Sequence, residues 1–327
     1  MTSTPALFGG GRSARVIFFG SGAFAVPILE ALVALPGLDI VAVVVPPDRP
    51  AGRRAELARV PVAARAAALG LPVRHVARVR APEAIAFIAA LHPDLGILAD
   101  FGQIIPPAIL QLPGHGILNI HPSILPRHRG ATPIAAAILA GDEEAGVTVM
   151  QMDAGLDSGP VVAVRRWRLL GGEDAPAIEA QAASAGARLL EEVLPSVLAG
   201  RAVATPQDPL GATMTRPLRR SDGRLDPSLP AALLERQVRA FRPWPGTHVE
   251  VGGLRLAVLE AAVGPAARDD RPGTLVGDNG GLAIATPAGR LRLGIVQPAG
   301  GRRMTGAAFR RGRPDLVGSA IGGARGA

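Results

Sequence analysis

The sequence predicts an α/β domain with an open, mostly parallel sheet, followed by a small β-barrel domain of the OB type. Up to about residue 200, apolar strand-like runs alternate with Ala-rich helical stretches, which is the pattern of a parallel sheet. After residue 213 the chain consists of short, Gly-punctuated, strand-like segments, and about five such strands suit a small barrel. With 327 residues, 48% of them hydrophobic, the chain is long enough for two domains.

In the first domain, short apolar runs between Gly or Pro residues predict strands, and longer Ala- and Leu-rich runs predict helices. The expected strands are residues 15–19, 39–45, 71–76, 95–99, 116–121 and 147–152. The expected helices are residues 24–35, 62–68, 82–91, 132–140 and 175–198. The helix at 175–198 has apolar residues at helical spacing and should close the domain.

We therefore expect a leader at residues 1–13, a catalytic domain at 14–200, a Pro- and Gly-punctuated linker at 201–212 and a C-terminal domain at 213–327. The C-terminal domain should contain a helix at 233–241 and strands at 247–251, 254–260, 282–286 and 291–295. Trp244 lies between two prolines. It could stack on a base, but packing at the domain junction is the favoured interpretation.

Residues 20–25 satisfy the G-x-G-x-x-A pattern of dinucleotide sites. The acidic residue expected after the second strand is instead Asp48, which lies in a Pro- and Arg-rich loop. A tight strand-to-helix turn that needs only small residues is therefore the favoured reading, and a nicotinamide-dependent oxidoreductase is a distant alternative.

The chain has no Cys, which excludes a disulfide framework, a thiolate nucleophile and a cysteine metal site. The His residues are scattered without metal-ligand spacing. All 35 basic residues are Arg, for a net charge of +8, a bias that a GC-rich bacterial genome explains without any function. Arg clusters nevertheless attract phosphate backbones. The clusters are Arg49, Arg53, Arg54 and Arg59; Arg216, Arg219, Arg220 and Arg224; and Arg302, Arg303, Arg310, Arg311 and Arg313.

Asn119 and His121 end a predicted strand, and Asp157 lies in a later Gly-bearing loop that could reach them. In an isolated N-x-H sequence, the histidine is more often a packed structural residue than a catalytic one. When an amine attacks an acyl carbon, however, the developing oxyanion needs a donor and the nitrogen needs a proton acceptor. Asn119 and His121 can supply these groups, and a carboxylate beside the imidazole would raise its pKa. The three residues are candidates for acyl transfer without a covalent enzyme intermediate.

The segments GILNIHPSILPRHRGATPI and AGDEEAGVTVMQMDAGLDSGPVV resemble the formyltransferases that use 10-formyltetrahydrofolate, and the resemblance covers nearly the whole chain. PDRPAGR at residues 47–53 and RAFRPWPGT from Arg239 resemble the family that acts on methionyl-tRNA. His128 stands where that family commonly has Trp, and Thr132 where it usually has Ala.

The resemblance implies a Rossmann-like catalytic domain that does not use NAD, with Asn119, His121 and Asp157 as its catalytic residues. It implies 10-formyltetrahydrofolate as co-substrate, without a metal, and initiator methionyl-tRNA as partner. The implied folate-binding residues are Phe101, Gly102, Gln103, Ile104, Ser123, Ile124, Leu125 and Pro126. The implied tRNA-binding residues are Arg49, Arg53, Arg54 and Arg59, with help from the C-terminal barrel.

The expected reaction is formylation of the methionyl amine on initiator tRNA. Formylation of an amino sugar nucleotide by the same chemistry and a non-catalytic RNA-binding module are the alternatives. The opening segment lacks the features of a signal peptide, and no apolar run reaches the roughly 20 residues of a membrane span. We expect a cytoplasmic monomer that does not bind membranes.

Overall fold

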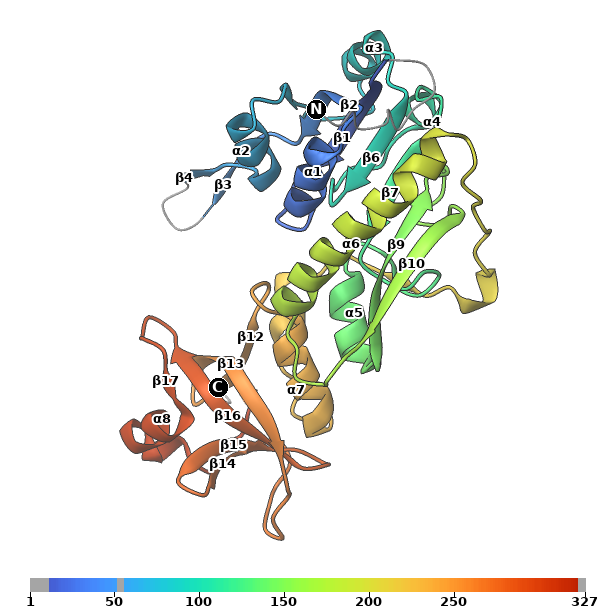
Figure 1. Ribbon diagram of the computed structural model, residues 1–327. Helices are drawn as coiled ribbons and strands as arrows, with labels where there is room; N and C mark the ends of the chain where they lie inside the picture. The colour runs from blue at the N-terminus through green and yellow to red at the C-terminus, as the bar shows by residue number, and fades with distance from the viewer. Residues whose placement is uncertain (1–11, 52–55, 323–327) are drawn as a thin grey trace, which may run out of the picture. The chain divides into compact units, whose positions relative to one another are not determined.

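The computed structural model describes residues 12–51 and 56–322, and these divide into two compact units (Figure 1). Unit 1 contains the described residues up to Pro133, together with Glu144–Arg168 and Ile178–Arg216. Unit 2 contains Ile134–Glu143, Leu169–Ala177 and the described residues from Pro217 onward. The predicted order of an α/β domain and then a β domain is confirmed. The domain limits expected from the sequence stay a prediction, because these units are defined by contacts and not by function.

A seven-stranded sheet forms the centre of unit 1, in the order β10-β9-β7-β6-β1-β2-β5. The strands are β1 (Ala14–Gly20), β2 (Leu38–Val45), β5 (Val73–His75), β6 (Leu95–Ala99), β7 (Ile117–His121), β9 (Glu144–Gln151) and β10 (Val161–Arg168). Strands β5, β2, β1, β6 and β7 are parallel, whereas β9 runs antiparallel to both β7 and β10. The mostly parallel sheet that the sequence predicts is therefore present.

The strand order reverses beside β1. From β1 the chain first builds β2 and β5 on one side, and then returns to build β6 and β7 on the other. In open α/β sheets, ligands bind outside the carboxyl ends of the strands at such a switch point. This position lies where β1 ends at Gly20 and β6 ends at Ala99, next to the end of β7.

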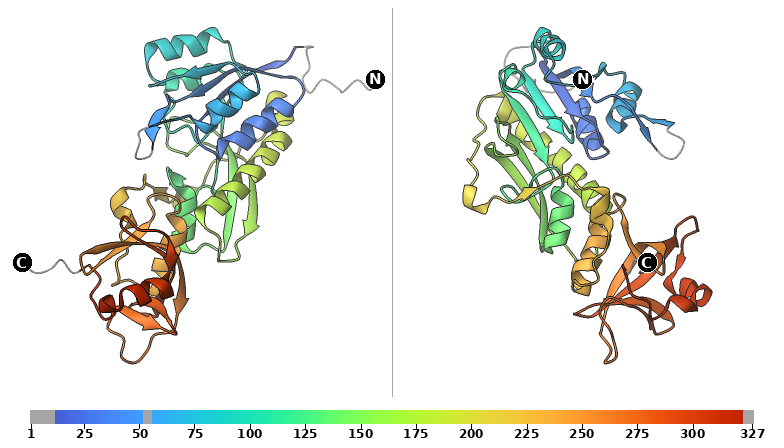
Figure 2. Two further views of the ribbon diagram at one scale, coloured as in Figure 1. Left: turned by 90° about the vertical axis from the view of Figure 1, so that its left-hand side faces the viewer. Right: turned by 180° about the vertical axis from the view of Figure 1, so that it is seen from behind.

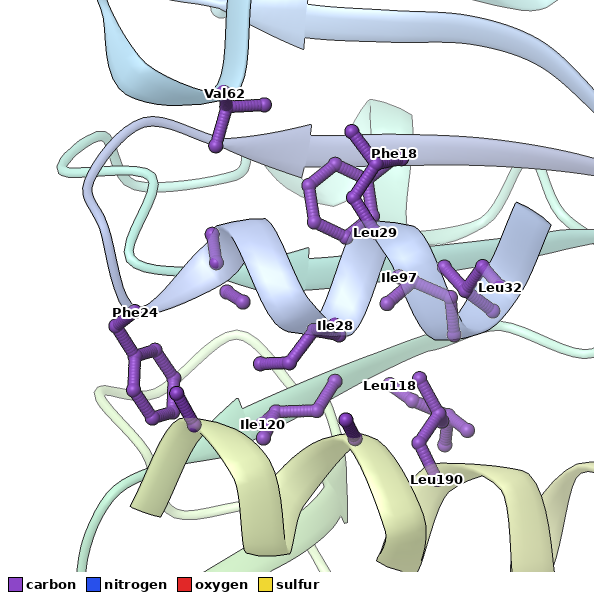
Figure 3. Packing of buried hydrophobic residues seen from close by; sticks show 14 of the residues in the cluster. Phe18, Phe24, Ile28, Leu29, Leu32, Val62, Ile97, Leu118, Ile120 and Leu190 are labelled. Carbon is purple, nitrogen blue, oxygen red and sulfur yellow. The ribbon is translucent and has the colours of Figure 1, made fainter. Parts of the chain in front are cut away.

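Helices cover both faces of this sheet: α1 (Ala25–Ala34), α2 (Pro61–Ala68) and α6 (Ala175–Leu198) supply one core cluster, and α3 (Pro82–Ala90) and α4 (Pro107–Leu110) supply the other. Two further views show α1 and α6 side by side (Figure 2). Close by, Ile28 of α1 and Ile120 of β7 face each other in the packed layer (Figure 3). A Cβ built on Gly186 of α6 would lie 2.8 Å from Ile120, so glycine permits this close approach.

Unit 2 is built on an antiparallel sheet in the order β12-β13-β16-β15-β14, with β17 paired to β16. Its strands are β12 (Thr247–Val251), β13 (Leu254–Gly264), β14 (Leu275–Asp278), β15 (Gly281–Ala285), β16 (Arg290–Pro298) and β17 (Met304–Thr305). Ile321 pairs with Val251 of β12, and Ala320 pairs with Thr274 next to β14. The same short segment thus joins both edges of the sheet, which closes it in the manner of a barrel. Unit 2 also contains α7 (Ala231–Ala240), α8 (Gly306–Gly312) and, apart from its first residue, α5 (Pro133–Ala140).

Several short elements were not predicted. Strand β10 is an edge strand whose second half, Arg165–Arg168, is mostly charged, so it lacks the alternation of a half-buried strand. The hairpin of β3 (Arg49–Ala51) and β4 (Glu56–Ala58) lies inside the predicted Arg-rich loop. Strands β8 (Arg129–Gly130) and β11 (Met214–Thr215) form a two-residue parallel pair. No helix in the described parts of the chain combines the length and the apolarity that crossing a membrane requires.

Candidate active site

Asn119 and His121 lie on β7, on the face opposite to the core contacts of Leu118 and Ile120. This follows from the two-residue period of a strand, which sends alternate side chains to opposite faces. Both polar residues are only 5% exposed. Buried polar groups at the carboxyl end of a central strand need hydrogen-bond partners, which are Asp157 for Asn119 and the carbonyl oxygen of His128 for His121.

Asp157 contacts both residues of β7. Asn119 Nδ2 donates to Asp157 Oδ1 at 3.1 Å, and Asp157 Oδ2 lies 3.7 Å from His121 Nδ1. The backbone N–H of Gly130 donates to the same Oδ2 at 2.8 Å. Asp157 has a left-handed φ of 50°, which is uncommon for a residue other than glycine. The surrounding contacts therefore hold the loop in a conformation that brings the carboxylate to Asn119 and His121.

The hydrogen bonds of His121 fix which ring nitrogen carries the proton. Nε2 lies 3.0 Å from the carbonyl oxygen of His128, and a carbonyl can only accept. The neutral ring must therefore be protonated on Nε2, an assignment that rests on the hydrogen-bond network. The lone pair of Nδ1 then faces the carboxylate of Asp157. Two acceptors that face each other are well placed to share a proton taken from a third group.

Burial lowers the pKa of His121 below its ordinary value, while Asp157 and the His128 carbonyl oppose this effect. The ring is therefore neutral near pH 7, in the state that can accept a proton. Asp157 favours the charged ring once the proton has arrived. A base that is neutral at rest and stabilised when charged suits proton transfer from an amine.

The segment 101–104 follows β6 and comes to the same edge of the sheet. Phe101 is buried and packs edge-to-face on Phe19, with ring centroids 5.5 Å apart. Gln103 bonds the backbone at two positions, Val79 N and Val76 O. Ile104, by contrast, is 81% exposed, and nothing lies within 4 Å of a Cβ built on Gly102. Two side chains thus anchor the loop, and the other two positions leave open space beside it.

Hydrogen bonds to neighbouring residues hold the segment 123–126 in place. Ser123 Oγ donates to Arg127 O at 2.7 Å, and Thr148 Oγ1 links Ser123 O to Leu125 N. Ser123 and Leu125 are buried, whereas Ile124 and Pro126 are half-buried. The side chains of Ser123 and Leu125 are engaged in packing, which leaves the backbone and the half-buried positions for contacts with a ligand.

Asp100 adds a second carboxyl group at the switch point. Burial and, to a smaller extent, the charge of Glu179 together raise the pKa of Asp100 to about 6, against the opposing effect of the Gly22 N–H. Part of the residue still reaches solvent. A Cβ on Gly22 would lie 1.8 Å from Asp100 Oδ2. The glycines of residues 20–25 therefore make room for neighbouring side chains, as the tight-turn reading predicts.

The Arg residues expected to bind tRNA are only partly described. Arg49 belongs to β3, and Arg59, just after β4, is exposed. Arg53 and Arg54 lie outside the described residues. The side chain of Asp48 accepts from Val60 N at 2.9 Å, which closes the base of the β3–β4 hairpin. Asp48 thus has a local structural role, as expected if it does not bind a ribose.

Sequence reasoning missed three residues that support this site: Arg129, Gln207 and Thr213. Gln207 bonds the backbone at Asp157 and Gly159, and Thr213 Oγ1 accepts from His128 N at 2.8 Å. Their contacts join segments far apart in the chain, so no local pattern could have revealed them. Among residues 12–51 and 56–322, no cluster of three or more His, Asp or Glu side chains could hold a metal ion.

Comparisons with known proteins identify the family of the chain. Residues 14–194 match the formyl transferase family and residues 217–314 match the formyl transferase C-terminal domain. The chain is 44% identical over 300 residues to the methionyl-tRNA formyltransferase of Chloroflexus aggregans, covering 91% of this chain and 97% of the relative. It is 43% identical over 310 residues to the enzyme of the same name from Halorhodospira halophila, covering 94% and 99%.

Solved structures share the fold at low identity. HypX from Aquifex aeolicus in complex with tetrahydrofolic acid matches with a TM-score of 0.59 and 18% identity, over 93% of this chain and 48% of that chain. The N-formyltransferase of Helicobacter canadensis, in complex with folinic acid and dTDP-3-aminofucose, matches with a TM-score of 0.62 and 13% identity, over 86% and 98%. The full-length similarity to the named enzymes is much stronger, and the chain belongs to the methionyl-tRNA formyltransferase family.

Proposed function

We propose that this protein transfers the formyl group of 10-formyltetrahydrofolate to the α-amine of methionine on initiator tRNA. The observation that carries the proposal is the contact of Asn119 and His121 with one carboxylate, Asp157, at the carboxyl end of β7. Membership in the family supports the choice of acceptor. Full-length relatives carry the methionyl-tRNA name, whereas the likeness to a sugar N-formyltransferase is one of fold, so the sugar-nucleotide alternative is not favoured.

In the first step, the neutral amine attacks the formyl carbon and forms a C–N bond. The carbonyl oxygen becomes an oxyanion, and the amine nitrogen must lose a proton. Asn119 uses one amide N–H on Asp157, and its second N–H can donate to the oxyanion. His121 Nδ1 accepts the proton, and Asp157 stabilises the imidazolium that forms.

In the second step, the tetrahedral intermediate collapses and the bond between the formyl carbon and N10 of the folate breaks. His121 returns its proton to N10, so the net change is the exchange of one N–H for another. The oxyanion becomes the formamide carbonyl. The enzyme ends in its starting protonation state, and this step requires no covalent intermediate.

We infer that the folate binds at segments 101–104 and 123–126. Ile104 and the open space at Gly102 support a contact with the flat pterin ring. Because Ser123 and Leu125 are engaged in packing, the second segment would contribute mainly backbone groups. Arg49, Arg53, Arg54 and Arg59 would contact the phosphates of the acceptor stem, and unit 2 would bind tRNA further out. We retain residues 14–200 as the catalytic domain and a cytoplasmic monomer as the working form.

The test is formation of formylmethionyl-tRNA from 10-formyltetrahydrofolate and methionyl initiator tRNA, in the wild type and in His121→Ala. Loss of the base is expected to lower kcat about 100- to 10,000-fold. His115→Ala, which removes a half-buried histidine just before β7, is the matched control and should retain kcat within about twofold.

Two results would count against the proposal. Wild-type protein that binds tRNA without forming product would favour the non-catalytic RNA-binding alternative. Product from a dTDP-linked amino sugar, with none from methionyl-tRNA, would instead favour the sugar-nucleotide reaction.

A further inference from the structure

Residues 205–216, here called the strap, run alongside the two segments that hold the catalytic groups. At one end Thr205 pairs with Val161, just after the Asp157 loop. At the other end β11 pairs with β8, and Thr213 O accepts from Arg129 N at 2.9 Å. The sequence predicts a linker over most of this segment, and residues of the segment form hydrogen bonds with the candidate active site.

Gln207 of the strap forms hydrogen bonds with the loop that carries Asp157. Its Nε2 donates to Asp157 O at 2.9 Å and to Gly159 O at 2.7 Å. Its Oε1 accepts from Arg129 Nε at 3.0 Å and from Arg129 Nη2 at 2.8 Å. A carboxamide has two donor hydrogens and two acceptor lone pairs, so all of them are used. Carbonyls only accept and a guanidinium only donates, which fixes the amide orientation.

The amide nitrogen and the amide oxygen of Gln207 support Asp157 in two different ways. The amide nitrogen of Gln207 binds the backbone of the Asp157 loop at Asp157 itself, whose φ of 50° is a strained conformation that persists only where the surrounding contacts impose it. The amide oxygen holds Arg129, and the next residue, Gly130, donates its N–H to Asp157 Oδ2. Gln207 therefore links the loop that carries the carboxylate to the backbone donor that orients it.

We propose that Gln207 is a positioning residue for formyl transfer, which keeps Asp157 aligned with His121 Nδ1 and Asn119 Nδ2. The proposal rests on the proposed function. Gln207 does not touch the reacting atoms in this account. It acts through Asp157, whose carboxylate must stay near His121 to stabilise the imidazolium.

The test compares Gln207→Met with Gln207→Glu. Methionine removes the hydrogen bonds to Asp157 O, Gly159 O and Arg129, whereas glutamate still accepts from Arg129 and loses the donations to the two carbonyls. Both variants are expected to lower kcat about 10- to 100-fold, because misplacing a catalytic group by about 1 Å has effects of this size. Both KM values should change less than about threefold, since the amide of Gln207 is engaged with protein groups and is not available to a substrate.

A positioning role also predicts a change that general instability would not produce. Asp157 raises the pKa of His121, so a displaced Asp157 should move the acidic limb of the kcat–pH profile to lower pH. Gln237→Glu is the matched control, because Gln237 also donates to two backbone carbonyls, Asp222 O and Arg224 O, within unit 2. Its kcat at saturating substrates and its pH profile should match the wild type.

Wild-type kcat in Gln207→Glu would overturn the inference, because the two donated hydrogen bonds would then be dispensable. A loss of kcat that follows a lower Tm, with an unmoved pH profile, would overturn it as well, because it would show a structural role only. Absence of formylmethionyl-tRNA with the wild type would refute the proposed function itself, and the inference with it. The wild-type reaction thus separates the two failures.

Discussion

The surroundings of the His121 ring predict the pH at which it titrates. Because burial lowers its pKa, the ring should titrate below 6.5 in the folded protein. Asp157→Asn removes a charge that raises the pKa, so the midpoint should fall further. Histidine ring C–H signals in NMR spectra recorded against pH would measure both values. A wild-type midpoint above 6.5, or an increase in the variant, would contradict this account.

The same shift has a consequence for stability. Between the folded value and 6.5, unfolded chains bind more protons at His121 than folded chains do. The free energy of unfolding therefore falls as pH drops through this window, and the full contribution of a neutral ring returns above 6.5.

Single residues also show how far a sequence can predict a site. Asn119, His121 and Asp157 could be selected because their chemistry matches acyl transfer and a family motif places them, and they meet in the structure. Gln207 could not be selected, since it lies in a Pro- and Gly-punctuated segment and its partners are 48 and 50 residues away at Gly159 and Asp157. Support of this kind depends on tertiary contacts between distant segments, and such contacts produce no recognisable motif in the sequence.

At the scale of elements, a group of charged side chains links β14 and β16 to the turn before β14. Arg290 lies 2.6 Å from Asp270 Oδ1 and 3.1 Å from Asp278 Oδ1, and the three side chains are 8–14% exposed. Hydrogen bonds from Arg290 lower the pKa of Asp270. The stabilisation that the Asp270 carboxylate gives the folded state is therefore present above pH 3.8, and it is lost as the pH falls through the lowered pKa of Asp270.

Asp270→Asn should lower the free energy of unfolding of unit 2 by about 2 kcal/mol at neutral pH, the range for a hydrogen bond to a charged group. The difference from the wild type should shrink as the pH falls below 3.8. Trp167→Phe leaves Trp244 of unit 2 as the sole tryptophan, so its fluorescence can follow denaturation by urea.

The control is Asp315→Asn, which breaks an exposed ion pair with Arg313 and should leave stability nearly unchanged. Equal effects of Asp270→Asn and Asp315→Asn would show that the group around Arg290 contributes nothing beyond a surface pair.

The main strands and helices could be predicted where apolar runs are long, as in β1, β2 and α6. Strand β10 and helix α8 could not. The first lies at the edge of the sheet with charged residues, and the second is a seven-residue segment with glycine at both ends. Their position depends on what they pack against more than on their own pattern.

For the molecule as a whole, the net charge of +8 has a measurable consequence if tRNA is the substrate. The association constant for methionyl-tRNA should fall steeply with salt, because bound phosphates release counterions. Arg59→Gln, at an exposed residue next to the base of the β3–β4 hairpin, should reduce the slope of log K against log salt by about one.

Arg188→Gln is the matched control. Arg188 is exposed on α6, where it bonds Ser184 of the same helix. Filter binding at several salt concentrations would measure both slopes. The same decrease in both variants would show that the effect reflects total charge and does not involve the hairpin.

The strap also bears on how this protein could be divided or recombined. A fragment ending at Gly200 would include Asn119, His121 and Asp157, but it would lack Gln207, Thr213 and the partner strand of β8. A separable catalytic module should therefore extend beyond the proposed domain limit at residue 200, to Arg216, where unit 1 ends. Any exchange of C-terminal domains between family members would have to join the chains beyond that residue, so that each active site retains its native strap.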